Sequence, residues 1–324
     1  MTSPKRATSS FAWPSDDHIM YVYAAAVYSN NARKGGGVYD KMNEQEQHDC
    51  DNVQHILESY HYVKKQSFVD VMRQDRAQVF LDSGAFSAYT LGVELKVSEY
   101  CAYIKRNIDL IRKEDGVLIA SVLDGIGDPL ETYKNQQEME ARGVTPLPCF
   151  HAGEDERYLE LYVRKYPYIT LGGMVGSSNK QLQIWLDRVW DRYLVDGSGR
   201  PKLKVHGFGI TSIPIMERYP WWSCDSSSWV QTAAFGAIMH PLYGNINISE
   251  NNPAKHDLGE HVNTLSPQEK EFVCNMLLEQ GYSYERLSTC YQSRFAYNLW
   301  AYGEMERNLS AKPEVFKDAV QELF

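Results

Sequence analysis

The feature that most constrains the fold is a repeated alternation between short apolar segments and helical segments. Each repeat has a β-branched or apolar run, then a glycine or polar residue, then a stretch with helical periodicity. Strands that alternate with helices are typical of parallel sheets, because each helix returns the chain to the start of the next strand. Eight segments have the composition of strands: 18–26, 78–82, 117–124, 145–151, 168–173, 203–210, 221–225 and 237–243. The expected helices are 52–73, 97–113, 129–142, 156–166, 179–194, 213–218 and 228–234.

Eight such strands predict an α/β fold of the (β/α)8 TIM-barrel type. The alternative is an open doubly wound sheet, which concentrates its reactive residues near one switch point. The barrel is favoured because polar candidate residues follow many of the strands here. We expect a tail over 1–17, a barrel over 18–250 and a C-terminal helical subdomain over 251–324, with helices at 267–280, 284–306 and 313–323. A polar insertion at 30–51 follows the first strand, so we expect it to lie over the active face.

The composition excludes several classes of protein. The chain has 324 residues, 43% of them hydrophobic, which is enough for a large core, and no apolar run approaches membrane-spanning length. The polar N-terminus lacks the apolar segment of a secretory signal. Six cysteines without a CxxC motif indicate reduced thiols and a cytoplasmic protein. The net charge of −9 argues against a protein that coats nucleic acid, but it permits a local basic groove.

Three aspartates stand at the ends of predicted strands. Asp82 ends an apolar run and opens into Ser83-Gly84-Ala85-Phe86, where it is either a functional carboxylate or a cap of the next turn. Asp124 ends the clearest strand, and Asp128 before Pro129 is the natural helix cap, which leaves Asp124 free. Asp225 follows an aromatic run, and the serines after it can cap the next helix. Since barrels build their chemistry at the carboxyl ends of strands, these residues predict one shared site.

The three carboxylates indicate a particular chemistry. Displacement at the anomeric carbon of a sugar needs one carboxylate to attack and another to move a proton. A carboxylate such as Asp124 in an apolar mouth accepts the paired N–H donors of a guanine edge. The pair Gly172-Gly173 would expose backbone to a flat ligand, or it forms a tight turn. Glycines around His206 and Gly209 indicate a close approach of ligand or backbone, and His206 itself is more simply a core histidine.

Taken in order, the short motifs resemble the tRNA-guanine transglycosylase superfamily, whose members exchange guanine for a 7-deazaguanine on a (β/α)8 barrel. The resemblance spans about residues 78–236. It rests on the segments 82–86, Asp124, 172–174, 206–210 and 224–226.

The resemblance implies a role for each matching residue. Asp225 would be the nucleophile and Asp82 the general acid and base. Phe86 would stack on the base, and Asp124 would bind the guanine edge. The family often has a glutamine after the fourth strand, where this chain has His151. The implied base pocket comprises Asp124, Phe86, Ser83, Gly84, His151, Gly172, Gly173, Met174 and Gly209.

The resemblance also implies the partners. The Cys-x-Cys-x-x-Cys…His zinc cluster of the tRNA enzymes is missing, and the serine-rich context of Asp225 is closer to the phage and bacterial branch that inserts preQ0-type bases into DNA. We therefore expect DNA and a free 7-deazaguanine base as partners, no membrane, no cofactor and no metal. The alternatives are tRNA as substrate, an inactive nucleic-acid-binding subunit, or a barrel glycoside hydrolase. An irregular structural zinc would use Cys274, Cys290, His256 and His261.

The target base must leave its stack before the enzyme reaches C1′, so we expect base flipping or a single-stranded substrate. The resemblance is compatible with a homodimer in the cytoplasm, the host cytoplasm if a phage encodes the protein. Basic side chains would hold the phosphates. The candidates are Arg33 and Lys34, followed by Lys180, Arg294 and Arg307.

Overall fold

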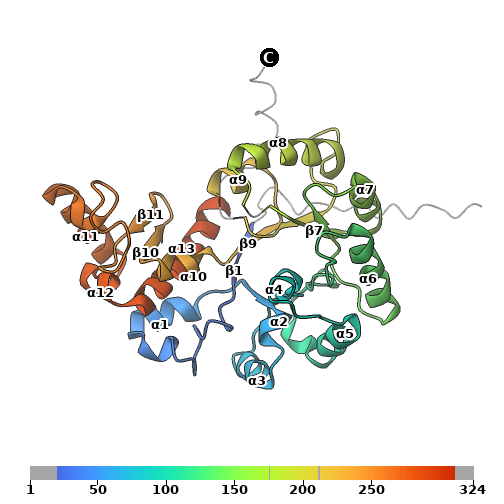
Figure 1. Cartoon of the computed structure of the whole chain (residues 1–324), viewed down its shortest axis with the longest axis horizontal. Helices are drawn as coiled ribbons and strands as arrows, with labels where there is room; N and C mark the ends of the chain where they lie inside the picture. The colour runs from blue at the N-terminus through green and yellow to red at the C-terminus, as the bar shows by residue number, and fades with distance from the viewer. Residues whose placement is uncertain (1–19, 175, 211, 311–324) are drawn as a thin grey trace, which may run out of the picture.

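The chain forms a curled, parallel seven-stranded sheet flanked by helices, an α/β fold (Figure 1). The computed structural model describes residues 20–174, 176–210 and 212–310, so the predicted tail 1–17 and helix 313–323 lie outside the described residues. The strand order β3-β2-β1-β9-β8-β7-β6 makes the first and last strands neighbours. The strands are β1 Tyr21–Ala25, β2 Ile56–Ser59, β3 Phe80–Asp82, β6 Cys149–His151, β7 Tyr168–Gly172, β8 Lys204–Gly207 and β9 Ser223–Ser226.

Helices cover the outer side of the sheet (Figure 1). Predicted helix starts are confirmed where capping signals were strong: the Asp128 side chain accepts the N–H groups of Leu130 and Glu131 at the start of α6. The helices of this outer ring are α2 Tyr60–Val63, α3 Gln66–Gln74, α5 Val97–Arg106, α6 Pro129–Ala141, α7 Glu156–Lys165, α8 Asn179–Val189 and α9 Ile213–Arg218. The short α4 Ala85–Thr90 lies inside the ring (Figure 1). A π-helical turn, Trp190–Leu194, continues α8.

Side-chain alternation along the strands divides the core in two. In β1, Val22 and Ala24 pack with the large cluster shared with the helices, whereas Tyr23 and Ala25 belong to a smaller cluster. Successive residues of a strand point to opposite faces, which produces this division. The smaller cluster comprises Tyr23, Ala25, Leu57, Phe80, Ile119, Leu147, Tyr168 and Trp222.

The predictions of a helix over 52–73 and of a sheet strand over 237–243 are wrong. The segment predicted as helix 52–73 contains the strand β2 near its start. Because β2 has only four residues and runs directly into α2, the helical pattern that follows hides the strand in the sequence. The segment 237–243, predicted as the eighth strand, instead forms an antiparallel hairpin of β10 Ala237–His240 with β11 Gly244–Asn247. This hairpin is not part of the seven-stranded sheet.

The predicted strand 117–124 is only partly regular. Its start, β5 Val117–Leu118, pairs antiparallel with β4 Lys113–Glu114. The following residues make isolated parallel bridges from Ala120 to Leu81 and from Ser121 to Leu147. The segment therefore lies between β3 and the residues that precede β6.

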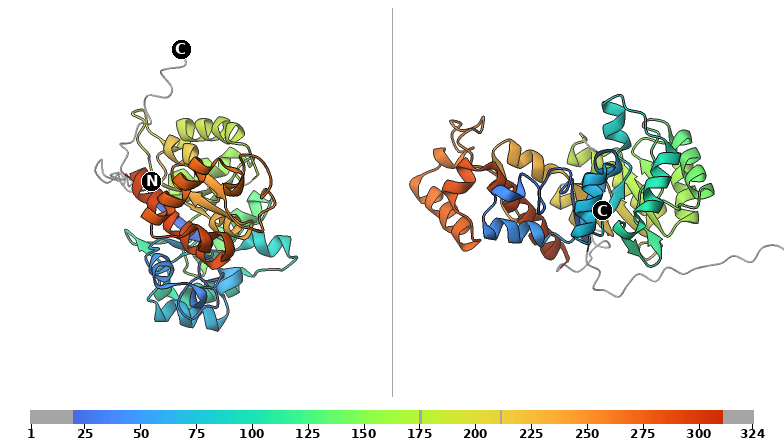
Figure 2. Two further views of the ribbon diagram at one scale, coloured as in Figure 1. Left: turned by 90° about the vertical axis from the view of Figure 1, so that its left-hand side faces the viewer. Right: turned by 90° about the horizontal axis from the view of Figure 1, so that it is seen from below.

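A side lobe lies beside the sheet (Figures 1 and 2). We use this name for α1 Glu44–Asp51, the β10–β11 hairpin, α11 Pro267–Glu279, α12 Tyr284–Thr289 and α13 Tyr291–Ser310. The short α10 Ser228–Ala234 packs against α13 and β10. The predicted helix 284–306 is interrupted at Cys290. Among the described residues, no helix combines the length and apolarity needed to cross a bilayer.

The insertion after β1 does not match the prediction that it covers the active face. Its helix α1 packs against α13 instead. Arg286 donates to Glu46 at 2.5 Å, and the Tyr282 hydroxyl donates to Asp49 at 2.6 Å. These partners lie more than 200 positions apart in sequence, so no local pattern could reveal their contact.

Candidate functional site

Asp82 is held by three elements at the end of β3. Its Oδ2 accepts hydrogen bonds from Ser59 Oγ at 2.9 Å and the Gly84 N–H at 2.8 Å, and its Oδ1 accepts one from Ser121 Oγ at 3.1 Å. Burial raises the pKa of Asp82, the hydrogen bonds oppose that rise, and the charge of Asp225 adds to it. Asp82 is therefore a carboxyl that holds a proton more readily than an exposed aspartate does.

Asp225 is fixed through one of its two oxygens. Its Oδ1 accepts the Gly209 N–H at 3.0 Å and lies 3.2 Å from His206 Nε2. The other ring nitrogen of His206 lies 2.7 Å from Ser223 Oγ, which in turn lies 2.7 Å from the Tyr168 hydroxyl. Asp225 is only 7% exposed, so this chain of contacts holds a nearly buried carboxylate in one orientation.

Asp124 forms a third cluster with residues of β6. His151 Nε2 lies 3.7 Å from Asp124 Oδ2 and 3.5 Å from Cys149 Sγ, while His151 Nδ1 lies 3.0 Å from Glu154 Oε1. Asp124 Oδ1 is buried without a hydrogen-bond partner. Burial raises the pKa of Asp124 to about 7, the charge of His151 lowers it, and the charge of Asp82 raises it.

The charges of the cluster also act on its other members. Cys149 and the hydrogen bonds to Cys149 and Glu154 raise the pKa of His151, and burial raises the pKa of Cys149 to about 11. The charge of Asp225 raises the pKa of Asp82, and the charge of Asp82 raises the pKa of Asp124. The three predicted carboxylates therefore share one electrostatic environment.

The glycine pair after β7 has a packing reason. A Cβ on Gly172 would lie 2.8 Å from His151 Cδ2 and 3.3 Å from Cys149 Sγ, so the missing side chain makes room for the Asp124 cluster. The Gly172 carbonyl accepts the Ala152 N–H at 3.0 Å. Gly173 is exposed with φ +71°, a backbone conformation that favours glycine, and the side chain of Met174 is buried.

Two residues of the motif after Asp82 serve the local backbone. Ser83 is fully buried, and its Oγ accepts the Ala85 N–H. Gly84 has φ +71°, and its N–H holds Asp82. Phe86, in contrast, is 64% exposed on α4, which Figure 1 shows inside the ring of helices. Tyr89 on the same helix is 66% exposed, so α4 presents two aromatic side chains to solvent.

The expectation for the phosphate-binding cations is contradicted for two arginines. Arg33 is 9% exposed, donates to the Val53 carbonyl at 2.7 Å and pairs with Asp51. Arg294 is 5% exposed and donates to the carbonyls of Ala233 and Leu287. Both guanidinium groups bind backbone carbonyls of the protein itself, because the insertion after β1 and the helix α13 bury them.

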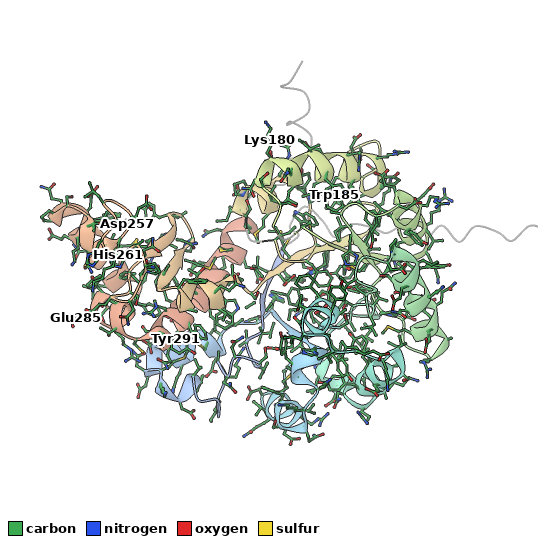
Figure 3. The ribbon with its side chains drawn as sticks, viewed as in Figure 1. Lys180, Trp185, Asp257, His261, Glu285 and Tyr291 are labelled. Atoms are coloured by element: carbon green, nitrogen blue, oxygen red, sulfur yellow. The ribbon has the colours of Figure 1, made fainter. Side chains whose placement is uncertain are left out.

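The other predicted cations stay on the surface. Lys34 is exposed, Lys180 projects from the start of α8 (Figure 3), and Arg307 pairs with Glu304.

The irregular zinc site also conflicts with the structure. His261 lies in the side lobe (Figure 3), where Nε2 contacts the Ser249 carbonyl at 3.0 Å and Nδ1 accepts the Asn263 N–H at 3.0 Å. Both ring nitrogens are therefore occupied, and Cys290 Sγ contacts Gln292. Within the described ranges, the group with metal-binding geometry is Asp124, Cys149 and His151 instead.

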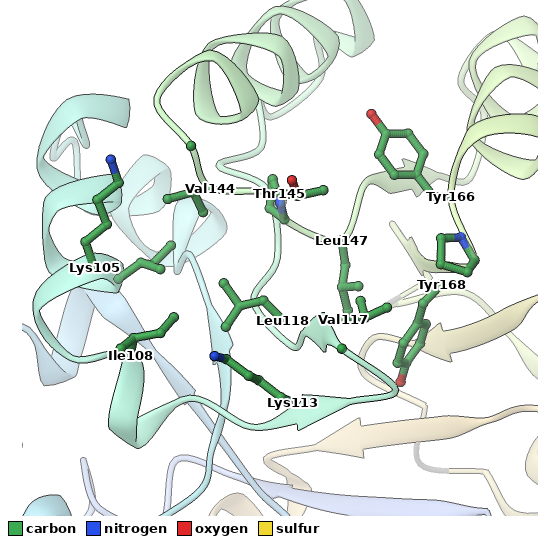
Figure 4. A pocket seen from close by; sticks show the side chains of 15 residues that line it. Lys105, Ile108, Lys113, Val117, Leu118, Val144, Thr145, Leu147, Tyr166 and Tyr168 are labelled. Atoms are coloured by element: carbon green, nitrogen blue, oxygen red, sulfur yellow. The ribbon is translucent and has the colours of Figure 1, made fainter.

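A cavity of about 600 Å³ opens at the opposite ends of the strands (Figure 4). Its wall includes Val117 and Leu118, Leu147 just before β6, and Tyr168 at the start of β7. It contains none of the predicted site residues, which cluster at the carboxyl ends.

Sequence reasoning missed several members of the site. Cys149 stands two residues before His151, a spacing that places both side chains on one face of a strand. Ser59 could not be found, because β2 was not recognised. Ser121 precedes Asp124 on the irregular segment and carried no separate signal.

Comparison with family models and with curated proteins found no match for the chain. The site combines a carboxylate fixed through one oxygen, a carboxyl whose pKa is raised by burial, and a third carboxylate with one oxygen that has no hydrogen-bond partner among the described residues.

Proposed function

We propose that the protein is a DNA-guanine transglycosylase, a pentosyltransferase that replaces guanine in DNA with a 7-deazaguanine base through a covalent aspartyl-deoxyribosyl intermediate. The observation that carries the proposal is the arrangement of Asp82, Asp124 and Asp225. They come from three separate segments and differ in their hydrogen-bond partners. The charge of Asp225 raises the pKa of Asp82, and the charge of Asp82 raises the pKa of Asp124. A retaining exchange at a sugar carbon needs such a division of roles between carboxylates.

We also infer that the sheet closes into an eight-stranded barrel. The parallel bridges of Ala120 with Leu81 and of Ser121 with Leu147 support this closure. Backbone hydrogen bonds accompany them: the Leu81 N–H donates to Ile119, and the Val122 N–H donates to Leu147. In this arrangement the segment 119–122 is the missing strand between β3 and β6.

In the proposed first half-reaction, Asp225 attacks C1′ of the target nucleotide. The C1′–N9 bond breaks as the C1′–Oδ bond forms, and Asp82 gives its proton to N9 of the departing guanine. His206 Nε2 and the Gly209 N–H both contact Oδ1 of Asp225, which leaves Oδ2 to face the sugar carbon. The raised pKa of Asp82 suits a group that must arrive protonated.

In the second half-reaction, the free 7-deazaguanine occupies the same pocket. Asp82, now ionised, takes the N9 proton, N9 attacks C1′, and the ester to Asp225 breaks. Two inversions at C1′ give net retention. The buried Asp124 Oδ1, which has no hydrogen-bond partner among the residues that the structure describes, would accept the N–H donors of either base. The exposed ring of Phe86 would stack on the base.

The preference for DNA over tRNA rests on the sequence context of Asp225. The serines and Trp229 of that context have structural contacts: Ser226 Oγ donates to Ser228 Oγ, and Trp229 Nε1 donates to the Ala25 carbonyl. They hold the start of α10 beside β1.

The test is incorporation of labelled guanine into guanine-containing DNA and, in parallel, into tRNA. We expect incorporation into DNA by the wild type and none by Asp225→Asn. Asp128→Asn is the matched control, because Asp128 caps α6 outside the carboxylate cluster. Label entering tRNA alone would overturn the DNA assignment, and undiminished exchange by Asp225→Asn would overturn the mechanism.

A further inference from the structure

We propose that Asp124, Cys149 and His151 form a binding site for a divalent metal ion of the zinc class. The inference goes beyond the proposed function and does not depend on it. One ligand atom from each residue lies within 4.8 Å of the others. A thiolate, an imidazole and a carboxylate together are a donor set that zinc accepts.

The distances from His151 Nε2 to the other two donor atoms are close to those of tetrahedral coordination. With a Zn–S bond of about 2.3 Å and a Zn–N bond of about 2.0 Å, a tetrahedral angle separates sulfur and nitrogen by about 3.5 Å. His151 Nε2 lies 3.5 Å from Cys149 Sγ and 3.7 Å from Asp124 Oδ2. The site therefore needs only a small adjustment to hold an ion.

The surroundings of His151 are those of a metal ligand. Its Nδ1 lies 3.0 Å from Glu154 Oε1, and the Glu154 Oε2 accepts the His151 backbone N–H at 3.0 Å. A carboxylate that binds Nδ1–H fixes the tautomer in which Nε2 has a free lone pair. The carboxylate–histidine pair thus orients Nε2 toward Asp124 and Cys149.

The position of Gly172 keeps the cluster compact. Any side chain there would meet both His151 and Cys149. Asp124 is about nine-tenths buried, and its second oxygen has no partner. The negative charge of a buried carboxylate beside an imidazole and a thiol is not fully balanced by the protein. A bound cation would balance it.

Binding changes the protonation of the site in a defined way. The metal replaces the Sγ proton of Cys149 and, where the ring is charged, the Nε2 proton of His151. Both protons pass to solvent, so that His151 binds as neutral imidazole. Three protein ligands leave a fourth position open, as in catalytic zinc sites. Asp124 would bind through Oδ2, so Oδ1 remains available to a base.

The test measures metal content and affinity in the full chain. We expect the wild type purified from zinc-supplemented medium to retain about one zinc per chain. Substitution with Co²⁺ should give a thiolate-to-cobalt charge-transfer band. Cys149→Ser should abolish the band, and Glu154→Gln should weaken zinc binding by about 10- to 100-fold in competition with a chromogenic chelator.

Cys274→Ser is the matched control, because Cys274 is a partly exposed thiol in α11. It should keep both the zinc and the band. A wild type without zinc, a Cys149→Ser variant that binds zinc normally, or a band lost in Cys274→Ser would each overturn the inference. Base exchange by a protein that fails to bind zinc would overturn only this inference, whereas zinc binding without exchange would overturn only the proposed function.

Discussion

His206 links Asp225 to the interior of the sheet: its Nε2 lies 3.2 Å from Asp225 Oδ1, and its Nδ1 lies 2.7 Å from Ser223 Oγ. The ring is fully buried, so water cannot replace either contact. His206 is therefore a positioning residue for Asp225, and the Gly209 N–H is its partner in that task.

We predict that His206→Ala lowers kcat for base exchange on the order of 100-fold, because a misplaced carboxylate loses its line of attack. KM for DNA should change little, since His206 does not face solvent. His206→Gln, which keeps an N–H donor, should recover part of the rate. Steady-state kinetics with both variants checks this, and a change confined to KM would contradict the positioning role.

The hydroxyl of Ser121 should influence the proton affinity of Asp82. Its hydrogen bond stabilises the ionised carboxylate, so Ser121→Ala should raise the pKa of Asp82 further. We expect the limb of the pH–rate profile due to Asp82 to move to higher pH. Ser83→Ala is the control, because the Ser83 hydroxyl accepts the Ala85 N–H. An identical shift of this limb in both variants would show that the limb does not report the ionisation of Asp82.

Gly172 should tolerate no side chain. In Gly172→Ala the new Cβ would lie 2.8 Å from His151 Cδ2, so the ring or the strand must move, at a cost of about 1–3 kcal/mol in the free energy of unfolding. Gly197→Ala is the control, because its Cβ meets nothing within 4 Å. Urea denaturation of both variants measures the difference, and equal stability would mean that the Asp124 cluster is loosely packed.

Glu58 should make stability depend on pH. Burial raises its pKa from 4.5 to about 7, while hydrogen bonds such as that from the Tyr28 N–H at 2.5 Å oppose the rise. Between those values the unfolded chain has released a proton that the native chain keeps, so rising pH lowers the stability. Relative to Glu58→Gln, the wild type should lose about 3 kcal/mol between pH 4.5 and 8. Denaturation across this range checks it; a constant difference between the two proteins would contradict it.

The sequence predicted well the parts of the molecule that local chemistry determines. Asp128 with Pro129 marks the start of α6, and the predicted bounds of α9 and α10 are confirmed. Asp82 and Asp225 could be placed near each other because parallel strands bring their carboxyl ends to one edge. Their charges do interact in the structure.

What the sequence could not provide depends on distant contacts. The burial of Arg33 follows from the packing of the insertion after β1, whose Glu46 pairs with Arg286. The strand β2 is too short to be distinguished from the helix that follows it. The cluster around Asp124 was not predicted. The spacing of Cys149 and His151 puts both on one face of β6, but their approach to Asp124 depends on the fold.

The most direct test of the account is the covalent intermediate itself. The wild type is incubated with a single-stranded guanine-containing oligonucleotide while released guanine is removed, quenched in denaturant, digested and analysed by mass spectrometry. We predict a deoxyribosyl adduct on the peptide that contains Asp225, absent in Asp225→Asn. Base exchange without an adduct, or an adduct on Asp82 instead, would contradict the account.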